Sequence, residues 1–196
     1  MLTGVFNRHE SLIKPQPEKL CACFNTAFYQ SHNTCLIGGA EEPMYVPAGD
    51  PCAGKALPYA QIYFTRDYLA SALHEVAHWC IAGRARRSLL DYGYWYAPDG
   101  RTSTQQAHFE QVEVKPQALE WIFSVALGIA FRISVDNLQQ GITASDSFKT
   151  AIYQQAITYL ERGLPPRAAL FAKALRQQFK GGDYHNKKNY SSVILS

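Results

Sequence analysis

The stretch TRDYLASALHEVAHWCIAG (residues 65–83) restricts the fold more than any other part of the chain. Its apolar residues recur at helical spacing, Thr65 can act as an N-cap, and Gly83 can end the helix. At about 100° per residue, His74 and His78 lie only about 40° apart around such a helix. The sequence therefore predicts a helix here, with both imidazoles facing one point.

Paired histidines one turn apart favour a metal site. Two neutral imidazole nitrogens at this spacing suit zinc, iron or copper. Glu75 completes an HExxH motif and stands beside the expected metal, where a carboxylate serves as a base or orients a ligand. Without a metal, the same pattern would be two core histidines bonded to helix backbone. We expect His74 and His78 to be metal ligands.

A third ligand has to come from elsewhere, because no further histidine follows at a short spacing. The segment HFEQVEVKPQALEW offers Glu110, Glu113 and Glu120. Pro116 suits the first turn of a helix, and we expect a long helix to follow it and to run to about Ser134.

Glu113 and Glu120 share one face of that expected helix with Gln117. A ligand glutamate followed four residues later by a polar residue is the pattern of gluzincin peptidases. By that analogy Glu113 is the expected third ligand and Gln117 hydrogen-bonds a ligand histidine. We expect Glu120 to orient His78 or contact substrate, with Glu110 and Glu120 as the alternative ligands.

The remaining periodicities predict an α+β fold, a mainly helical single domain with a small sheet, in which the HExxH helix packs against the second long helix. Its 196 residues, 47% of them hydrophobic, suffice for one core. We assign residues 1–182 to this domain and 183–196 to a flexible tail. Gly- and Pro-rich residues 37–58 indicate turns around a short strand. Further helices are expected at 17–31, 144–162 and 165–179, and strands at 44–46 and 60–64.

Several classes of protein are disfavoured by composition. No apolar run is long enough for a membrane span, and the first residues do not resemble a signal peptide. Five cysteines without a CxxC pair favour free thiols in a reducing cytosol. A net charge of +3 is too small to argue for nucleic acid. We therefore expect a cytoplasmic protein with no membrane partner and no direct nucleic-acid binding.

Several motifs in order carry a resemblance to a known family: HExxHW, an Arg-Arg pair, DYGYWYAPDGR and VEVKPQALEW. Over roughly residues 15–140 the chain resembles the elongation factor P hydroxylase family. The resemblance implies hydroxylation of the β-lysyl-lysine side chain of translation elongation factor P. It also implies a 2-His-1-carboxylate-like metal centre on a fold similar to a bacterial endoribonuclease with an HxxxHxxxxxH motif. His74 and His78 match directly, whereas Glu113 follows only from the residue pattern.

Such an enzyme would use Fe(II) and molecular oxygen, since two histidines and one carboxylate are the ligands of non-haem Fe(II) oxygenases. The same ligands around tetrahedral zinc give a hydrolase. An HExxH zinc peptidase is therefore an alternative, and a nuclease-like metal hydrolase or an RNA-binding module is another. The sequence has no flavin, nicotinamide or 2-oxoglutarate fingerprint, so the electron donor is open.

Residues for the doubly cationic substrate are expected just after the HExxH helix. Aromatic rings there could offer cation–π faces, namely Tyr92, Tyr94, Trp95 and Tyr96. Asp91 and Asp99 could pair with ammonium groups. Arg84, Arg86 and Arg87 could meet an acidic surface of the protein substrate. The alternative is that the rings are core, the acids cap turns and the arginines form a solvated helix end.

Overall fold

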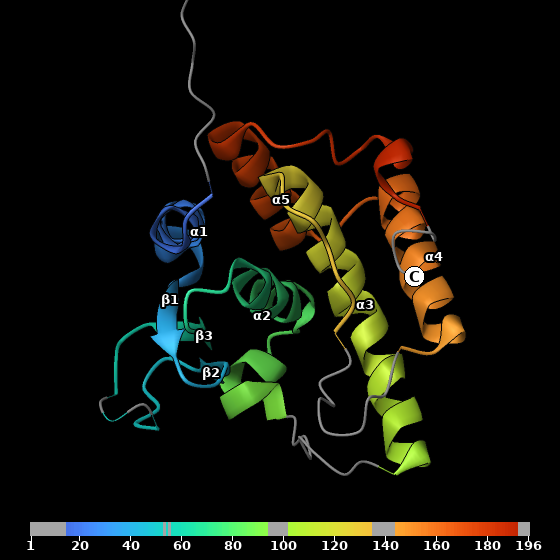
Figure 1. The fold of residues 1–196 in the computed structure, drawn as a ribbon. Coiled ribbons are helices and arrows are strands. Elements are labelled where there is room, and N and C mark those ends of the chain that lie inside the picture. The colour runs from blue at the N-terminus through green and yellow to red at the C-terminus, as the bar shows by residue number, and fades with distance from the viewer. Residues whose placement is uncertain (1–14, 53, 55, 94–101, 135–143, 192–196) are drawn as a thin grey trace, which may run out of the picture.

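The central helix of the fold is α2 (Leu69–Ile81) (Figure 1). The small sheet and the first helix of the chain lie on one side of α2, and the last three α-helices lie on the other. The computed structural model describes residues 15–52, 54, 56–93, 102–134 and 144–191. The helices are α1 (Pro17–His32), α2 (Leu69–Ile81), α3 (Ser103–Leu127), α4 (Asp146–Arg162) and α5 (Pro166–Phe179). The strands are β1 (Thr34–Ala40), β2 (Met44–Val46) and β3 (Ala60–Thr65). The expected α+β class is confirmed, with the HExxH helix α2 packed on the long helix α3.

The sheet has the order β1-β3-β2, with β1 parallel and β2 antiparallel to β3. Strand β1 corrects our prediction, because its segment TCLIGGA was expected to form turns from Ile37 onward. A Cβ placed on Gly38 would lie 2.7 Å from the Phe64 ring. The glycine thus permits a close approach between neighbouring strands, which is a known use of glycine within a sheet.

Helix α2 begins three residues later than its sequence suggests, with Tyr68 rather than Thr65 as the N-cap. Thr65, the expected N-cap, belongs to β3 and pairs with Ala40 of β1. Arg66 then adopts a left-handed conformation with φ of 45°, so the chain turns sharply from the sheet into α2. At the other end Ala82 is the C-cap, one residue before the expected stop. The turn places the helix directly on the sheet.

Helix α3 begins well before Pro116, where we expected a first turn. Thr102 and Gln105 form a reciprocal capping box that starts the helix at Ser103. Pro116 lies inside the helix, where it lacks an amide hydrogen. Gly128 ends the helix in a left-handed conformation, short of residue 134. Consequently the candidate glutamates are all helical, including Glu110.

The core is continuous from the sheet side to the outer helices. Phe24 and Phe28 of α1 pack edge-on against Trp79 of α2, and Phe171 of α5 joins them. Helices α1, α4 and α5 closely match the ranges predicted from periodicity. Within the described residues, no helix is both long and apolar enough to cross a bilayer.

The segment expected to be a flexible tail packs onto α3 as far as it is described. Tyr184 and Tyr190 are buried, and the Tyr190 ring lies 5.3 Å from that of Trp121. The Tyr190 hydroxyl donates a hydrogen bond to the Tyr184 carbonyl over 2.7 Å. Burial of these two tyrosines packs residues 183–191 against the domain, whereas the flexibility of the tail stays a prediction. Residues 192–196 lie outside the described part.

Candidate metal centre

Helices α2 and α3 cross where the two histidines project. The Nε2 atoms of His74 and His78 lie 3.1 Å apart, as expected for one helix face at one-turn spacing. Two ring nitrogens this close repel each other unless a proton or another cation lies between them. The pair is partly buried, with side-chain exposures of 18% and 12%.

Glu113 of α3 brings a carboxylate to the same point. Its Oε1 lies 3.2 Å from Nε2 of His78, and its Oε2 lies 3.4 Å from Nε2 of His74. Its side chain is only 3% exposed. One donor atom from each of the three residues can be chosen so that all lie within 4.8 Å of one another. The expected grouping of His74, His78 and Glu113 is thus present as a geometric cluster.

Glu120 holds the other nitrogen of His74. The His74 Nδ1 and the Glu120 Oε2 are 2.9 Å apart. A carboxylate on the second ring nitrogen fixes the orientation and tautomer of a metal-binding histidine. We had expected Glu120 to orient His78. One helical turn separates the two rings, and the crossing of α2 and α3 brings Glu120 to the first of them.

Gln117 does not bond a histidine as we expected. Its amide nitrogen donates to the Ser134 carbonyl over 2.7 Å, and its oxygen accepts from the Ser134 amide. The Gln117 amide also helps to lower the pKa of the Glu113 carboxyl. Gln117 therefore ties the chain after α3 to the third candidate ligand.

Glu110 lies outside the cluster. Its Oε2 accepts a hydrogen bond of 2.7 Å from the Ser145 hydroxyl, and Ser145 is the N-cap of α4. Glu110 thus fastens the start of α4 to α3, which explains a charged residue at that position without a metal.

The charges of the cluster favour a cation. Burial acts to lower the pKa of His74, but Glu113 and Glu120 outweigh it and raise that pKa well above 6.5. Burial also acts to raise the pKa of Glu113, yet His78 and His74 outweigh it and lower that pKa to about 2. For Glu120, burial dominates and raises the pKa. Glu113 therefore stays ionised, and a proton on His74 or a metal ion can balance it.

The donor set fits a metal ion. Coordination bonds of about 2.0–2.2 Å to nitrogen and oxygen separate neighbouring ligand atoms by roughly 2.8–3.6 Å. The two histidine nitrogens lie 3.1 Å apart, and each lies 3.2 or 3.4 Å from a different oxygen of Glu113. These separations fall in that range when both oxygens of Glu113 coordinate. Two imidazoles with one carboxylate suit iron and zinc alike.

Glu75, the acid of the HExxH motif, is half-buried beside this cluster. Burial raises its pKa, although His74 and His78 act in the opposite direction. A carboxyl group of raised pKa next to a candidate metal centre can carry or accept a proton. Its expected role as a base stays a prediction.

The predicted substrate residues are only partly within the described chain. Tyr94, Trp95, Tyr96 and Asp99 lie outside it. Asp91 accepts a hydrogen bond of 2.7 Å from the Tyr45 amide, and the buried Tyr92 ring stacks on Tyr45 with centroids 4.3 Å apart. These two residues therefore have structural contacts that hold a left-handed turn, with φ of 45° and 57°.

The predicted arginines differ in their surroundings. Arg84 and Arg86 are exposed, and Arg86 donates to the Tyr92 carbonyl over 3.2 Å. Arg87 is half-buried. Both Arg86 and Arg87 belong to a short 3-10 helix, η1 (Arg86–Ser88), which follows α2 after residues 82–85.

Sequence reasoning missed Arg167, which supports the end of the HExxH helix. Its Nη2 donates to the carbonyls of Trp79, Cys80 and Ala82 over 2.9, 3.0 and 2.6 Å. These are carbonyls that a helix end leaves without partners. The absence of a glycine cap at Ala82 was the one available signal, but it does not reveal a partner on α5.

Comparisons with known proteins agree on one family. A family model described as "EpmC: Elongation factor P hydroxylase" matches residues 23–189. A curated protein of Haemophilus influenzae, named "Elongation factor P lysine hydroxylase", is 49% identical over 158 residues. That match covers 81% of this chain and 86% of the relative.

Proposed function

Because the chain belongs to the elongation factor P hydroxylase family, we propose that it hydroxylates the β-lysyl-lysine side chain of translation elongation factor P. The observation that carries this proposal is the convergence of His74, His78 and Glu113 from two packed helices. Such an enzyme must hold one carbon of a long side chain near an oxidising centre, and ligands on two helices give that centre a rigid base. We place this activity in the cytoplasm, with elongation factor P as the protein partner.

Fe(II) is the metal that we propose for the three ligands. Two histidines and one carboxylate leave coordination positions for other groups, as in non-haem Fe(II) oxygenases. Bound Fe(II) would supply the activation of molecular oxygen that hydroxylation of a carbon requires. We leave the reducing co-substrate unassigned.

The protein's own groups prepare the centre. In the tautomer that we propose, Nδ1–H of His74 donates a hydrogen bond to Glu120, which leaves the Nε2 lone pair free to face the cluster. Gln117 supports Glu113 from the side of Ser134. Glu75 is the group that we assign to proton transfer, because it is half-buried beside both histidines and its pKa is raised by burial.

Recognition of the substrate needs groups for two ammonium charges and for the surrounding protein. We assign binding of the β-lysyl-lysine side chain to Asp91, through ion pairing, and to the aromatic rings of Tyr94, Trp95 and Tyr96, through cation–π contacts. Arg86 and Arg87 would meet an acidic surface and act mainly on encounter.

Mass spectrometry of β-lysylated elongation factor P tests the function. Incubation with the chain, Fe(II), oxygen and a reductant should add one oxygen atom to the modified lysine, and the His74→Ala variant should add none. Unlysylated elongation factor P is the substrate control. Two results together would replace the proposal with the HExxH peptidase alternative. The iron-loaded chain would add no oxygen under any reductant, and the chain as purified would contain stoichiometric zinc and hydrolyse peptides.

A further inference from the structure

Tyr45 of the edge strand β2 contacts both short helical segments that follow α2. Its hydroxyl donates a hydrogen bond of 2.8 Å to the Arg87 carbonyl in η1. Its amide donates to Asp91 Oδ1 over 2.7 Å, and its ring stacks on that of Tyr92, with centroids 4.3 Å apart and ring planes at 14°. Asp91 and Tyr92 belong to η2 (Leu90–Gly93). A single buried residue thus fastens two consecutive segments to the sheet.

The bond between the Tyr45 amide and Asp91 follows from the position of β2 in the sheet. In the described sheet β2 pairs with β3 on one side only, so amides on its other side need partners elsewhere. The Asp91 carboxylate is that partner for Tyr45. The bond uses one carboxylate oxygen, so the other oxygen can meet a cation. Burial raises the pKa of Asp91, and the hydrogen bond from the Tyr45 amide acts against this rise and favours the ionised form.

The turn that Tyr45 contacts has a strained backbone. Asp91, Tyr92 and Gly93 have φ of 45°, 57° and 72° in succession. Residues other than glycine rarely adopt this conformation, and it persists where the surrounding structure holds it. Arg86 adds a contact between η1 and η2, because its Nη1 donates to the Tyr92 carbonyl over 3.2 Å. The conformation of η2 therefore depends on its contacts with β2 and η1.

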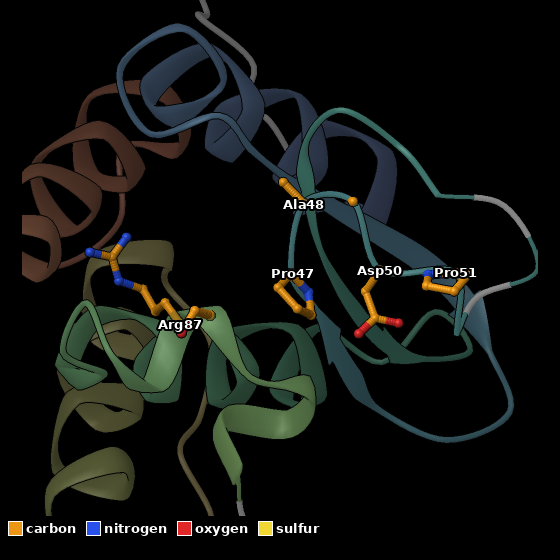
Figure 2. A pocket seen from close by; sticks show the side chains of 7 residues that line it. Pro47, Ala48, Asp50, Pro51 and Arg87 are labelled. Atoms are coloured by element: carbon orange, nitrogen blue, oxygen red, sulfur yellow. The ribbon is translucent and has the colours of Figure 1, made fainter.

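The segment that follows β2 lies beside η1. Residues 47–51 line an open pocket together with Arg87 and Ser88. Figure 2 shows the Arg87 guanidinium extending away from the 47–51 segment. The backbone of Arg87 is held at both ends, because its amide donates to the Gly83 carbonyl over 3.1 Å and its carbonyl accepts from Tyr45. Tyr45 therefore fixes the point on η1 from which the Arg87 side chain extends.

We propose that Tyr45 is a positioning residue for substrate binding. It holds Asp91 and Arg87 in place before the substrate arrives; the inference rests on the proposed function, in which Asp91 meets an ammonium group and Arg87 an acidic surface. Recognition groups that are already ordered lose less conformational entropy on binding. Tyr45 acts on η1 and η2, whereas the candidate metal ligands come from α2 and α3. Loss of its hydroxyl should therefore weaken binding of elongation factor P without changing metal affinity.

Tyr45→Phe tests this role, because it removes the bond to the Arg87 carbonyl and keeps the ring. Calorimetry of the Fe(II)-loaded chain without oxygen should show binding of β-lysylated elongation factor P weakened about fivefold, the value of one hydrogen bond. Steady-state hydroxylation should show a similar rise in KM, with kcat changed less than about twofold. Iron titration should give the wild-type affinity.

Tyr63→Phe is the matched control on the neighbouring strand. Tyr63 of β3 pairs with Met44 of β2, and its hydroxyl donates to Gln61 Oε1 over 2.6 Å. The variant thus loses one tyrosine hydrogen bond in the same sheet without touching η1. Its affinity for elongation factor P and its KM should change less than about twofold.

Amide hydrogen exchange measures the effect on η1 and η2 without any substrate. The amides of residues 87–92 should exchange about fivefold faster in Tyr45→Phe, and Tyr63→Phe should leave them as in wild type. Unchanged exchange in Tyr45→Phe would overturn the proposal. Faster exchange with unchanged affinity would also overturn it, because Tyr45 would then stabilise the segment without serving recognition. A fall in kcat at constant KM would have the same consequence.

Circular dichroism establishes that Tyr45→Phe is folded. Should it unfold, Tyr92→Leu replaces it, because this change removes the ring stacking on Tyr45 and leaves β2 intact. Tyr92→Leu should likewise weaken binding of elongation factor P, and unchanged affinity in this variant would count against the proposal.

The wild-type chain separates this inference from the proposed function. If wild type hydroxylates elongation factor P and Tyr45→Phe binds it equally well, only the role of Tyr45 is wrong. If wild type binds elongation factor P without hydroxylating it, the proposed function fails, and the affinities of the variants still decide the role of Tyr45. Absence of binding by wild type would overturn both.

Discussion

Two regions of α2 meet opposite charge. The face with His74 and His78 lies against the carboxylates of Glu113 and Glu120 on α3. The C-terminal end of the same helix meets Arg167 from α5. The first region can balance its charge with a proton on His74, whereas the second lacks a carboxylate among the described residues. One helix thus meets carboxylates on one face and an arginine at its C-terminal end.

Removal of either histidine should break the first region completely. We expect His74→Ala and His78→Ala each to abolish stoichiometric metal binding while the fold persists, because both side chains remain partly exposed. Elemental analysis with circular dichroism measures both properties. Full metal content in either variant would show that the assignment of ligands is wrong.

Glu113→Ala should weaken metal affinity by orders of magnitude, since it removes the carboxylate that, in the described part of the chain, contacts both histidines. Glu110→Ala is the control on the same helix, because Glu110 binds Ser145. Iron affinity in the two variants decides between them, and a larger loss in Glu110→Ala would reverse the assignment.

Glu120→Ala should weaken metal affinity about 10–100-fold, the range for loss of a group that orients a ligand. Glu120→Gln keeps an oxygen that can accept the His74 proton and should recover part of that loss. Metal titration of both variants measures the effect. If Glu120→Ala binds metal like the parent, the contact with His74 does not matter for the centre.

At the C-terminal end of α2, Arg167→Ala should lower the free energy of unfolding by about 2 kcal/mol, because it removes hydrogen bonds from a charged donor. The value is near the lower limit for such bonds, since Arg167 is half-exposed and solvent weakens them. Arg162→Ala, an exposed arginine in the last turn of α4, should change it by less than about 0.5 kcal/mol. Urea denaturation compares them. Equal values would mean that the three carbonyl contacts contribute no net stability.

Metal affinity should depend on pH in a direction set by His74. Glu113 and Glu120 raise the pKa of His74 above its usual value despite burial, so a proton competes with the metal below that pKa. Affinity should rise about tenfold per pH unit until the pH exceeds it. Metal titrations at several pH values below the pKa of His74 measure this slope. Metal binding without release of a proton would contradict competition between proton and metal for His74.

Short-range patterns predicted the parts of the molecule that depend on one element. The spacing of His74 and His78 was sufficient to place both rings on one face, and periodicity located α1, α4 and α5. Two predictions failed where one residue was given too much weight. Pro116 suggested a helix start, but the capping box at Thr102 begins α3 earlier. The glycines of β1 suggested turns, although Gly38 accommodates the Phe64 ring.

Contacts between elements were harder to predict. Glu113 joined the histidines as expected, but the partner of Glu120 depends on where α3 crosses α2, which no local pattern contains. The contact between Arg167 and α2 joins residues 85 to 88 positions apart. Other arginines occur in the C-terminal third of the sequence, and no local pattern singles out Arg167. Only the packing of α5 against α2 shows that Arg167 contacts the end of α2.

The packing of Tyr190 on Trp121 has a consequence for synthesis of the protein. A chain made from its N-terminus produces all three candidate ligands and the whole of α3 before Tyr184 and Tyr190 exist. Until then the Trp121 face of α3 lacks these aromatic partners. Folding domains with exposed apolar surface are prone to association. A ribosome that pauses between these points would therefore hold a nascent chain that contains the candidate metal ligands but exposes an apolar face of α3.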